Sequence, residues 1–252
     1  MWVLKVGGRQ LDQPHFLQGL AALLRQFPSP PVVVHGGGRG TTQLSERLGL
    51  ESRFVEGLRV TNTATLEAAT MGLAGLAKMQ MVQGLVNEGV AALGLTGVDG
   101  ALVRCRKLEH HGEDLGWVGE PVAVDGPALL RLIASGWVVC LSPLCLGLDG
   151  MLYNVNADHV AGAVAAAVGA ETLIFVSDVS GVMVDGQSLP ELDRALYQDL
   201  LERGHLGEGM LPKLKACFDA LEQGVKQVLI SDLQGVAAWL RGEASGTVIR
   251  HG

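Results

Sequence analysis

Short apolar segments that alternate with helical segments constrain the fold of this chain more than any other feature. Residues 2–6, 32–35, 172–176 and 228–231 are brief apolar runs, several of them rich in β-branched residues. Segments between them space apolar side chains as a helix does, as in residues 16–27. Strands that alternate with helices form right-handed βαβ units. The sequence therefore predicts an α/β fold, in which helices cover both faces of a mostly parallel central sheet (an αβα sandwich).

Capping residues and glycines predict where the helices of the first half begin and end. One helix is expected over residues 41–48, after the glycine-rich turn at residues 36–40. A long helix is expected over residues 63–87, with Thr63 or Thr65 as its N-cap. One face of this long helix carries small side chains and suits close packing, including packing against a second subunit: Ala68, Ala69, Gly72, Ala74 and Gly75.

Two further segments have weaker patterns. Residues 102–124 are interpreted as a β-hairpin at the rim of the sheet, and residues 247–249 as an edge strand. His110 and His111 lie in the hairpin and are expected to be solvated, because no other ligand stands at metal-binding spacing. The role of residues 107–117 is open, and a lid over the substrate is one interpretation.

Composition excludes several classes of function. The 252 residues carry a net charge of −7 without a run rich in Lys or Arg, which argues against nucleic-acid or anionic-membrane binding. The four cysteines form no C-x-x-C pair, so buried, reduced thiols are expected and a zinc site is not. Neither a signal peptide nor an uninterrupted apolar run of transmembrane length is present, so a cytoplasmic protein is expected.

Glycine-rich turns and polar residues follow several of the predicted strands. Gly7 and Gly8 end the first strand, and residues 36–40 end the second and lead into a helix. A strand, a glycine-rich turn and a helix together present backbone N–H groups to phosphate. Asp178 and the polar motif at residues 154–158 also follow strands. Because ligands bind at the carboxyl ends of parallel strands, these groups are expected to converge on one edge of the sheet.

The motif Asn-Val-Asn-Ala-Asp at residues 154–158 opens a segment of small residues that is expected to be a helix. One of its three polar side chains is expected to cap that helix, since Asn and Asp are preferred N-caps. Capping needs only one such residue. Three polar side chains at a helix N-terminus, where anions are already favoured, therefore indicate a binding site as well.

Three cations are candidates for the site. Lys5 lies within the first strand, Lys213 opens a helix, and Arg59 lies in a glycine-containing loop or short strand pair. A buried lysine needs a partner, and Asp158 is the candidate for Lys5, Lys213 or both. The alternatives are that Lys213 is a solvated surface lysine and that Lys5 extends from the strand end to water.

Two glycine-rich turns, two lysines and a carboxylate fit phosphoryl transfer, which depends on positioning and charge neutralisation. The chain contains no Gly-x-x-x-x-Gly-Lys-Ser/Thr motif, so it is not a P-loop enzyme. Residues 36–40 also lack the six-residue dinucleotide pattern. The His-Gly-Gly-Gly run at residues 35–38 occurs in lipases, but the Gly-x-Ser-x-Gly elbow that a lipase needs is missing.

Six motifs in order along the chain resemble those of the amino acid kinase family. They are Lys-Val-Gly-Gly at 5–8, His-Gly-Gly-Gly at 35–38, Gly-Leu-Arg-Val-Thr at 57–61, Asn-Val-Asn-Ala-Asp at 154–158, Ser-Asp-Val-Ser-Gly at 177–181, and Gly-Met at 209–210 with Lys213. The resemblance covers essentially the whole chain. The third and fourth motifs are similar to the branch that phosphorylates N-acetyl-L-glutamate in arginine biosynthesis.

This resemblance implies a reaction and a role for each site residue. ATP, with Mg²⁺ bound through its own oxygens and no protein metal ligands, would phosphorylate the side-chain carboxylate of N-acetyl-L-glutamate. The implied catalytic residues are Lys5, Lys213, Asp158 and Gly8. The implied substrate-binding residues are Gly37, Gly38, Arg59, Asn154 and Asn156. The implied nucleotide-binding residues are Asp178, Val179, Ser180, Gly181, Val182, Met183, Leu206, Gly207 and Met210.

The resemblance also implies an organisation. A single amino acid kinase domain would span residues 1–252, with an N-terminal lobe of about 1–170 for the amino acid and the dimer contact. The C-terminal lobe, about 171–252, would hold the nucleotide. A homodimer without arginine feedback is expected, because arginine-inhibited relatives carry an extra N-terminal helix. Two alternatives stay open: a kinase for carrier-protein-linked aminoadipate or glutamate, and a non-catalytic amino-acid or nucleotide sensor.

Overall fold

The main sheet of the protein contains eight strands, seen in a computed structural model that describes residues 1–110, 112–207 and 210–251. In spatial order the strands are β14 (Glu191–Leu192), β16 (Thr247–Ile249), β15 (Gln227–Ser231), β11 (Thr172–Val176), β1 (Trp2–Val6), β2 (Val32–His35), β8 (Val138–Ser142) and β5 (Ala92–Thr96). Neighbouring strands are parallel, except that β15 and β16 are antiparallel. The predicted mostly parallel sheet is confirmed.

The prediction that residues 247–249 form an edge strand is wrong. β16 lies between β15 and β14, and the two-residue strand β14 takes the edge. All three residues of β16 are buried, which pairing on both sides of the strand explains. A strand as short as β14 leaves no hydrophobic pattern by which the sequence could reveal it.

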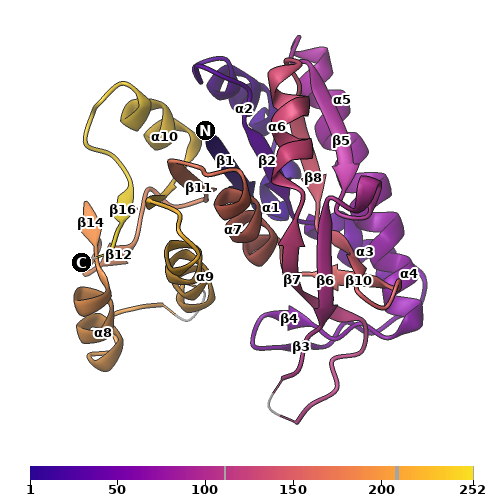
Figure 1. Ribbon diagram of the computed structural model, residues 1–252. Coiled ribbons are helices and arrows are strands. Elements are labelled where there is room, and N and C mark those ends of the chain that lie inside the picture. Colours follow the sequence, from indigo (N-terminus) through magenta and orange to yellow (C-terminus); the bar gives the residue numbers. More distant parts are fainter. Residues whose placement is uncertain (111, 208–209, 252) are drawn as a thin grey trace.

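Helices cover both faces of this sheet (Figure 1). One face packs against α6 (Gly126–Ala134), α7 (Ala157–Ala167) and α9 (Leu211–Glu222). The other packs against α2 (Phe16–Leu24), α5 (Lys78–Asn87) and α10 (Leu233–Leu240). Within β1, Val3 belongs to the first core and Leu4 and Val6 to the second. The period of two therefore places Lys5 on the α7 face.

Further helical segments lie around the main sheet, and the long helix expected over residues 63–87 is among them. They are α1 (Gly8–Leu11), α3 (Gly38–Arg47), α4 (Thr63–Thr70), the π-helix η1 (Met71–Ala77), the 3₁₀ turn η2 (Asp99–Ala101) and α8 (Arg194–Glu202). Helix α3 begins three residues before the expected Thr41. The long helix is α4, η1 and α5 in succession, and its N-cap is Asn62, whose side chain accepts a hydrogen bond from the Thr65 backbone at 2.9 Å. Asn is a stronger N-cap than Thr, which explains the shift.

The small face of the long helix packs within this chain. Ala68, Ala69 and Gly72 are buried, and a side chain at Gly72 would clash with Thr41 of α3. The expectation that this face meets a second subunit is therefore wrong for these three residues. They bring α3, and the glycine turn before it, close to the long helix.

Smaller strand pairs lie beside the main sheet. Four strands pair in a closed ring, in which β6 and β7 form the predicted antiparallel hairpin: β6 (Val103–Lys107), β7 (Val118–Val124), β9 (Leu144–Gly147) and β10 (Leu152–Val155). Two short hairpins are β3 (Phe54–Val55) with β4 (Leu58–Arg59), and β12 (Met183–Val184) with β13 (Gln187–Ser188). The β3–β4 hairpin and the end of the β6–β7 hairpin lie next to each other (Figure 1), linked by the bridge between Thr61 and Gly116.

Two predictions about single residue types can be compared with the structure. His110 is not solvated, because its side chain is only 13% exposed and its Nε2 lies 3.5 Å from the Glu56 carboxylate. His111 lies outside the described residues. The four cysteines are free and buried, as predicted. Within the described part of the chain, no helix combines the length and apolar character needed to cross a membrane.

Candidate active site

Three neighbouring strands, β11, β1 and β2, bring three of the predicted site motifs to one edge of the sheet. Their carboxyl ends continue into Ser177 and Asp178, into Gly7 and Gly8, and into the turn that begins at Gly36. The Gly36 backbone N–H donates to the Val6 carbonyl at 3.1 Å, and a Cβ on Gly36 would lie 3.2 Å from the Gly8 nitrogen. The two glycine turns thus touch backbone to backbone, and the expected convergence is observed.

Lys5 and Asp158 form an ion pair at the centre of this edge. Lys5 Nζ lies 2.6 Å from Asp158 Oδ1, and the two side chains are 15% and 16% exposed. Asp158 occupies the first turn of α7, where Asn156 is the N-cap and accepts a hydrogen bond from the Asp158 backbone at 2.7 Å. The carboxylate of Asp158 therefore lies between the lysine ammonium and the N-terminus of α7.

Lys213 reaches the same place from α9. Its ammonium donates to the Ser177 hydroxyl at 2.9 Å, and the Ser177 hydroxyl in turn lies 3.3 Å from the Asp178 carboxylate. Burial lowers the pKa of Lys213, the charge of Lys5 lowers it further, and Asp158 opposes both effects. Lys213 is thus not a solvated surface lysine. Its hydrogen-bond partner is Ser177, a motif residue for which the sequence predicted no role. Asp158 interacts with Lys213 by charge attraction, without a direct hydrogen bond in the structure described.

A small pocket of about 200 Å³ opens beside this pair of lysines. It collects four of the five predicted substrate residues, Gly37, Arg59, Asn154 and Asn156, while Gly38 begins α3. The Asn154 amide donates to the Thr61 hydroxyl at 3.3 Å. A side chain at Gly37 would overlap Thr41. The pocket therefore combines backbone N–H groups, side-chain amides and one guanidinium.

Arg59 is held in the pocket by the short β3–β4 hairpin. Glu56 and Gly57 form its two-residue turn, both with positive φ (46° and 80°), as a type I′ turn requires. Phe54 pairs with Arg59 across the hairpin, and the guanidinium lies 4.6 Å from the centre of the Phe54 ring. This register positions the Arg59 side chain over an aromatic face.

The Arg59 guanidinium donates to two hydroxyls, of Ser52 and of Thr42, the latter at 2.9 Å. Among the described residues no carboxylate forms an ion pair with it, and burial lowers its pKa. A half-buried cation with neutral partners favours an anionic ligand. Sequence reasoning missed Thr42, Ser52 and Phe54, because only the folded hairpin brings them to Arg59.

The predicted nucleotide residues lie in two segments near Lys213. Residues 178–183 follow β11, and within them Val182 is fully buried, with its N–H donating to the Thr247 hydroxyl at 2.8 Å. Leu206 is also buried in the core. Val182 and Leu206 can therefore meet a ligand only through their backbones. Asp178, Ser180, Met183 and Gly207 are exposed, Val179 is half-buried, Gly181 is buried, and Met210 is the half-buried N-cap of α9. Residues 208 and 209, including the motif glycine Gly209, lie outside the described residues.

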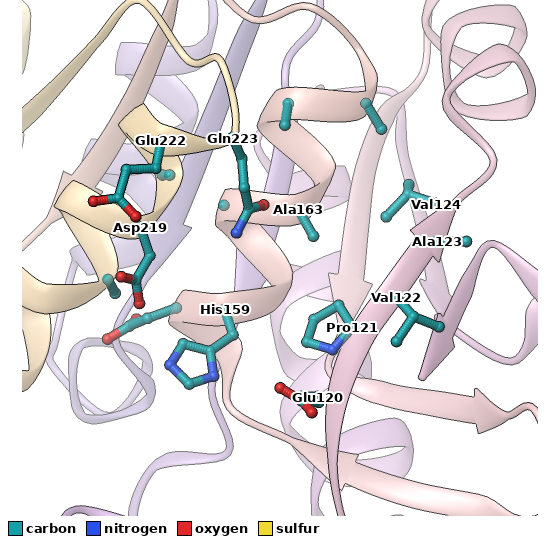
Figure 2. A pocket seen from close by; sticks show the side chains of 16 residues that line it. Glu120, Pro121, Val122, Ala123, Val124, His159, Ala163, Asp219, Glu222 and Gln223 are labelled. Carbon is teal, nitrogen blue, oxygen red and sulfur yellow. The ribbon is translucent and has the colours of Figure 1, made fainter. Parts of the chain in front are cut away.

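A larger cavity, of about 710 Å³, lies behind Asp158 between β7, α7 and α9. Figure 2 shows Glu120, His159, Asp219 and Glu222 around it, with small side chains such as Ala163. No lysine or arginine of the described residues lines it. Because carboxylates repel phosphate, this cavity does not suit a nucleotide, although it is the larger of the two.

Comparison with known proteins agrees with this geometry. A sequence profile of the amino acid kinase family matches residues 1–232. The acetylglutamate kinase of Chloroflexus aurantiacus is 46% identical over 251 residues, which cover 99% of this chain and 96% of that protein. The acetylglutamate kinase of Methanopyrus kandleri is 42% identical and is covered completely. The crystal structure of smu.665 from Streptococcus mutans superposes with a TM-score of 0.82 at 26% identity, covering 99% of this chain and 98% of that one. The chain belongs to the amino acid kinase family.

Proposed function

We propose that this chain is an acetylglutamate kinase, which transfers the γ-phosphoryl group of ATP to the side-chain carboxylate of N-acetyl-L-glutamate in arginine biosynthesis. The observation that carries the proposal is the Lys5–Asp158 pair with Lys213 beside it, next to a pocket that holds Arg59, which has no carboxylate partner among the described residues. The family supports the reaction class. The Chloroflexus and Methanopyrus relatives support the substrate.

The amino-acid substrate occupies the 200 Å³ pocket. Arg59 pairs with its α-carboxylate, because this guanidinium has only neutral partners among the described residues. Asn154 and the backbone N–H groups of the turn at Gly37 and Gly38 bind its polar atoms, and Asn156 keeps the start of α7 in place. This arrangement points the side-chain carboxylate toward Lys5 and Gly8.

The chemical step needs no general base. An oxygen of the side-chain carboxylate attacks the γ-phosphorus, the bond from that phosphorus to the ADP oxygen breaks, and its electron pair leaves with ADP. The product is an acyl phosphate. The main obstacle is the approach of two anions, which Lys5, Lys213 and the N–H groups of Gly8 and Gly37 offset. Asp158 holds Lys5 and reduces the repulsion between the two lysines.

The nucleotide is held by residues 178–183 and by Leu206, Gly207 and Met210, partly through backbone groups. Among the described residues, no group of three or more His, Cys, Asp or Glu side chains could ligate a metal. Mg²⁺ would enter with ATP and would supply charge neutralisation at the phosphates. Lys5 and Lys213 neutralise further negative charge on the transferring phosphoryl group.

The same proposal covers the organisation of the molecule. The chain forms one kinase domain, with the amino acid in an N-terminal lobe of about residues 1–170 and the nucleotide in a C-terminal lobe of about residues 171–252. It works as a homodimer in the cytoplasm. The exposed apolar side chains of Met71, Leu76 and Met79 on η1 and α5 support a subunit contact there. Light scattering of the purified chain tests the dimer, and a monomeric mass at all concentrations would contradict it.

The decisive experiment is Mg²⁺-ATP-dependent ADP release with N-acetyl-L-glutamate, run beside glutamate, aspartate and N-acetyl-aminoadipate. Hydroxylamine traps the acyl phosphate. Preference for N-acetyl-L-glutamate is expected. ADP release only with a carrier-linked aminoadipate or glutamate would replace this substrate. ATP or ligand binding without any ADP release would identify a sensor.

Replacing Arg59 with alanine is expected to raise KM for N-acetyl-L-glutamate roughly 30- to 100-fold, with a smaller change in kcat. The reason is that the guanidinium binds a carboxylate that does not react. Steady-state kinetics with each substrate varied in turn measure both constants. Arg53→Ala is the matched control, since Arg53 is exposed and pairs with Glu113 on the surface. A larger effect on KM for ATP would contradict the proposed lobes.

The pH dependence of kcat should report Lys213. A lysine with a lowered pKa loses its proton earlier as the pH rises, so kcat is expected to fall at a pH below the ordinary lysine value of 10.5. In Lys213→Arg the guanidinium stays protonated, and this basic limb should disappear even if kcat is lower. Rate profiles up to pH 10 measure both. An identical basic limb in the arginine variant would assign it to another group.

A further inference from the structure

His35 is the last residue of β2 and directly precedes the glycine turn of the site. Its side chain is fully buried, and its Nδ1 lies 3.2 Å from the carbonyl oxygen of Gly36. A carbonyl oxygen can only accept, so Nδ1 carries the proton and donates it. Burial lowers the pKa of His35 to about 4, and the imidazole is therefore neutral, with Nε2 unprotonated.

The other ring nitrogen of His35 has no hydrogen-bond partner among the described residues. The hydroxyl of Ser142 on β8 is also buried without a hydrogen-bond partner among the described residues. The register that pairs Val34 with Leu141 places Ser142 beside His35. A buried polar atom without a partner destabilises the folded chain, and an apolar side chain would avoid that cost. Packing therefore does not explain an imidazole at this position, whereas its bond to Gly36 does.

That bond fixes the direction of one peptide group. The Gly36–Gly37 peptide is trans and planar, so its carbonyl and its N–H point in opposite directions. His35 holds the carbonyl toward the buried side, and the Gly37 N–H consequently faces the other way. Gly37 lines the substrate pocket. Consecutive glycines leave this peptide free to rotate, so its orientation has to be set by a neighbour.

We propose that His35 is a positioning residue: its Nδ1–H bond to the Gly36 carbonyl orients the Gly36–Gly37 peptide so that the Gly37 N–H points at the substrate and the transferring phosphoryl group. The role rests on the proposed kinase function. His35 itself does not touch the reacting atoms, and it takes no proton in the reaction.

Two substitutions of similar size separate this role from a packing role. The amide of His35→Asn places an N–H near the position of Nδ1, whereas His35→Leu removes the donor. His35→Leu is expected to lower kcat by about 10- to 100-fold, less than the loss of a whole oxyanion donor. KM for ATP should change less than about threefold. Tm should change little, because removing the unpaired Nε2 offsets the loss of the Nδ1–H bond to the Gly36 carbonyl. His35→Asn should restore most of kcat.

A second readout does not depend on turnover. Amide hydrogen exchange of peptides covering residues 33–41 should accelerate in His35→Leu and stay close to wild type in His35→Asn. Ser142→Ala is the control, because it removes the neighbouring unpaired atom without touching Gly36; kcat and exchange should match wild type. If the leucine variant does not fold, His35→Gln replaces it. The amide of Gln lies near the position of Nε2, so it fills the site without donating to the Gly36 carbonyl.

The outcomes are distinct. Equal losses in the asparagine and leucine variants, or wild-type kcat and exchange in His35→Leu, would overturn the positioning role. A wild-type chain without kinase turnover would overturn the proposed function, while the exchange comparison would still decide whether His35 orders the glycine turn.

Discussion

Lys213→Ala is expected to lower kcat by roughly three orders of magnitude, while KM for N-acetyl-L-glutamate changes less than about threefold. The Lys213 ammonium donates to the Ser177 hydroxyl, and burial and the charge of Lys5 lower its pKa before any substrate binds. Its charge is therefore poorly solvated before the substrates bind. The Lys213 charge should therefore interact most strongly with the negative charge that moves toward ADP in the transition state. Its loss should lower kcat and leave the binding of the amino acid nearly unchanged.

Steady-state and single-turnover kinetics measure this effect, and Lys215→Ala is the matched control. Lys215 lies two residues further along α9 and is exposed, so its loss should leave kcat within about twofold. Thermal unfolding of both variants checks that the fold is intact. Wild-type kcat in Lys213→Ala would exclude this lysine from the transition state, whatever its distance from the substrate.

Asp158→Asn is expected to reduce the free energy of unfolding by about 2–4 kcal/mol, since it leaves Lys5 largely buried without a counter-ion. It should also lower kcat about 100-fold, because Lys5 and Lys213 then repel each other and lose their positions. Binding of anions should change in the opposite direction. Two unneutralised lysines attract phosphate more strongly, so the Kd for ATP is expected to stay the same or fall.

A double-mutant cycle with Lys5→Met assigns these effects to the ion pair. If the pair carries the loss in stability, Asp158→Asn should cost far less in the Lys5→Met background than in wild type. Urea unfolding gives the four free energies, and isothermal titration gives the Kd for ATP. Additive losses in stability, or much weaker ATP binding in Asp158→Asn, would show that the carboxylate has another role, such as contact with the nucleotide.

The parts of the site that the sequence predicts are those governed by local rules. The motif at residues 154–158 predicts a polar cap at a helix N-terminus, which the structure assigns to Asn156, and the cost of burying a lysine predicts Asp158 as a partner of Lys5. The glycines of the two turns follow from the ends of β1 and β2. Each of these inferences uses only a few consecutive residues and the general behaviour of parallel sheets.

Contacts between distant segments could not be predicted in the same way. Ser177 becomes the partner of Lys213, and Thr42 a partner of Arg59, only when α9 and the β3–β4 hairpin have docked. The local sequence around a serine or threonine does not indicate which distant side chain its hydroxyl will bind. The two-residue strand β14 escaped prediction for a related reason, since its assignment depends on pairing with β16 and not on its own residues.

The central position of β1 in the sheet also matters while the chain is being synthesised. β1 pairs with β2, which follows after a short connection, but its other neighbour, β11, spans residues 172–176. At about 5–20 residues per second, a ribosome delivers β11 roughly 7–28 s after β2. During that interval one side of β1 is an unpaired strand edge, and its residues Val3, Leu4 and Val6 are buried in the finished protein. The strand that carries Lys5 is thus the first to be made, yet it is paired on both sides only after the second half of the chain has begun to arrive.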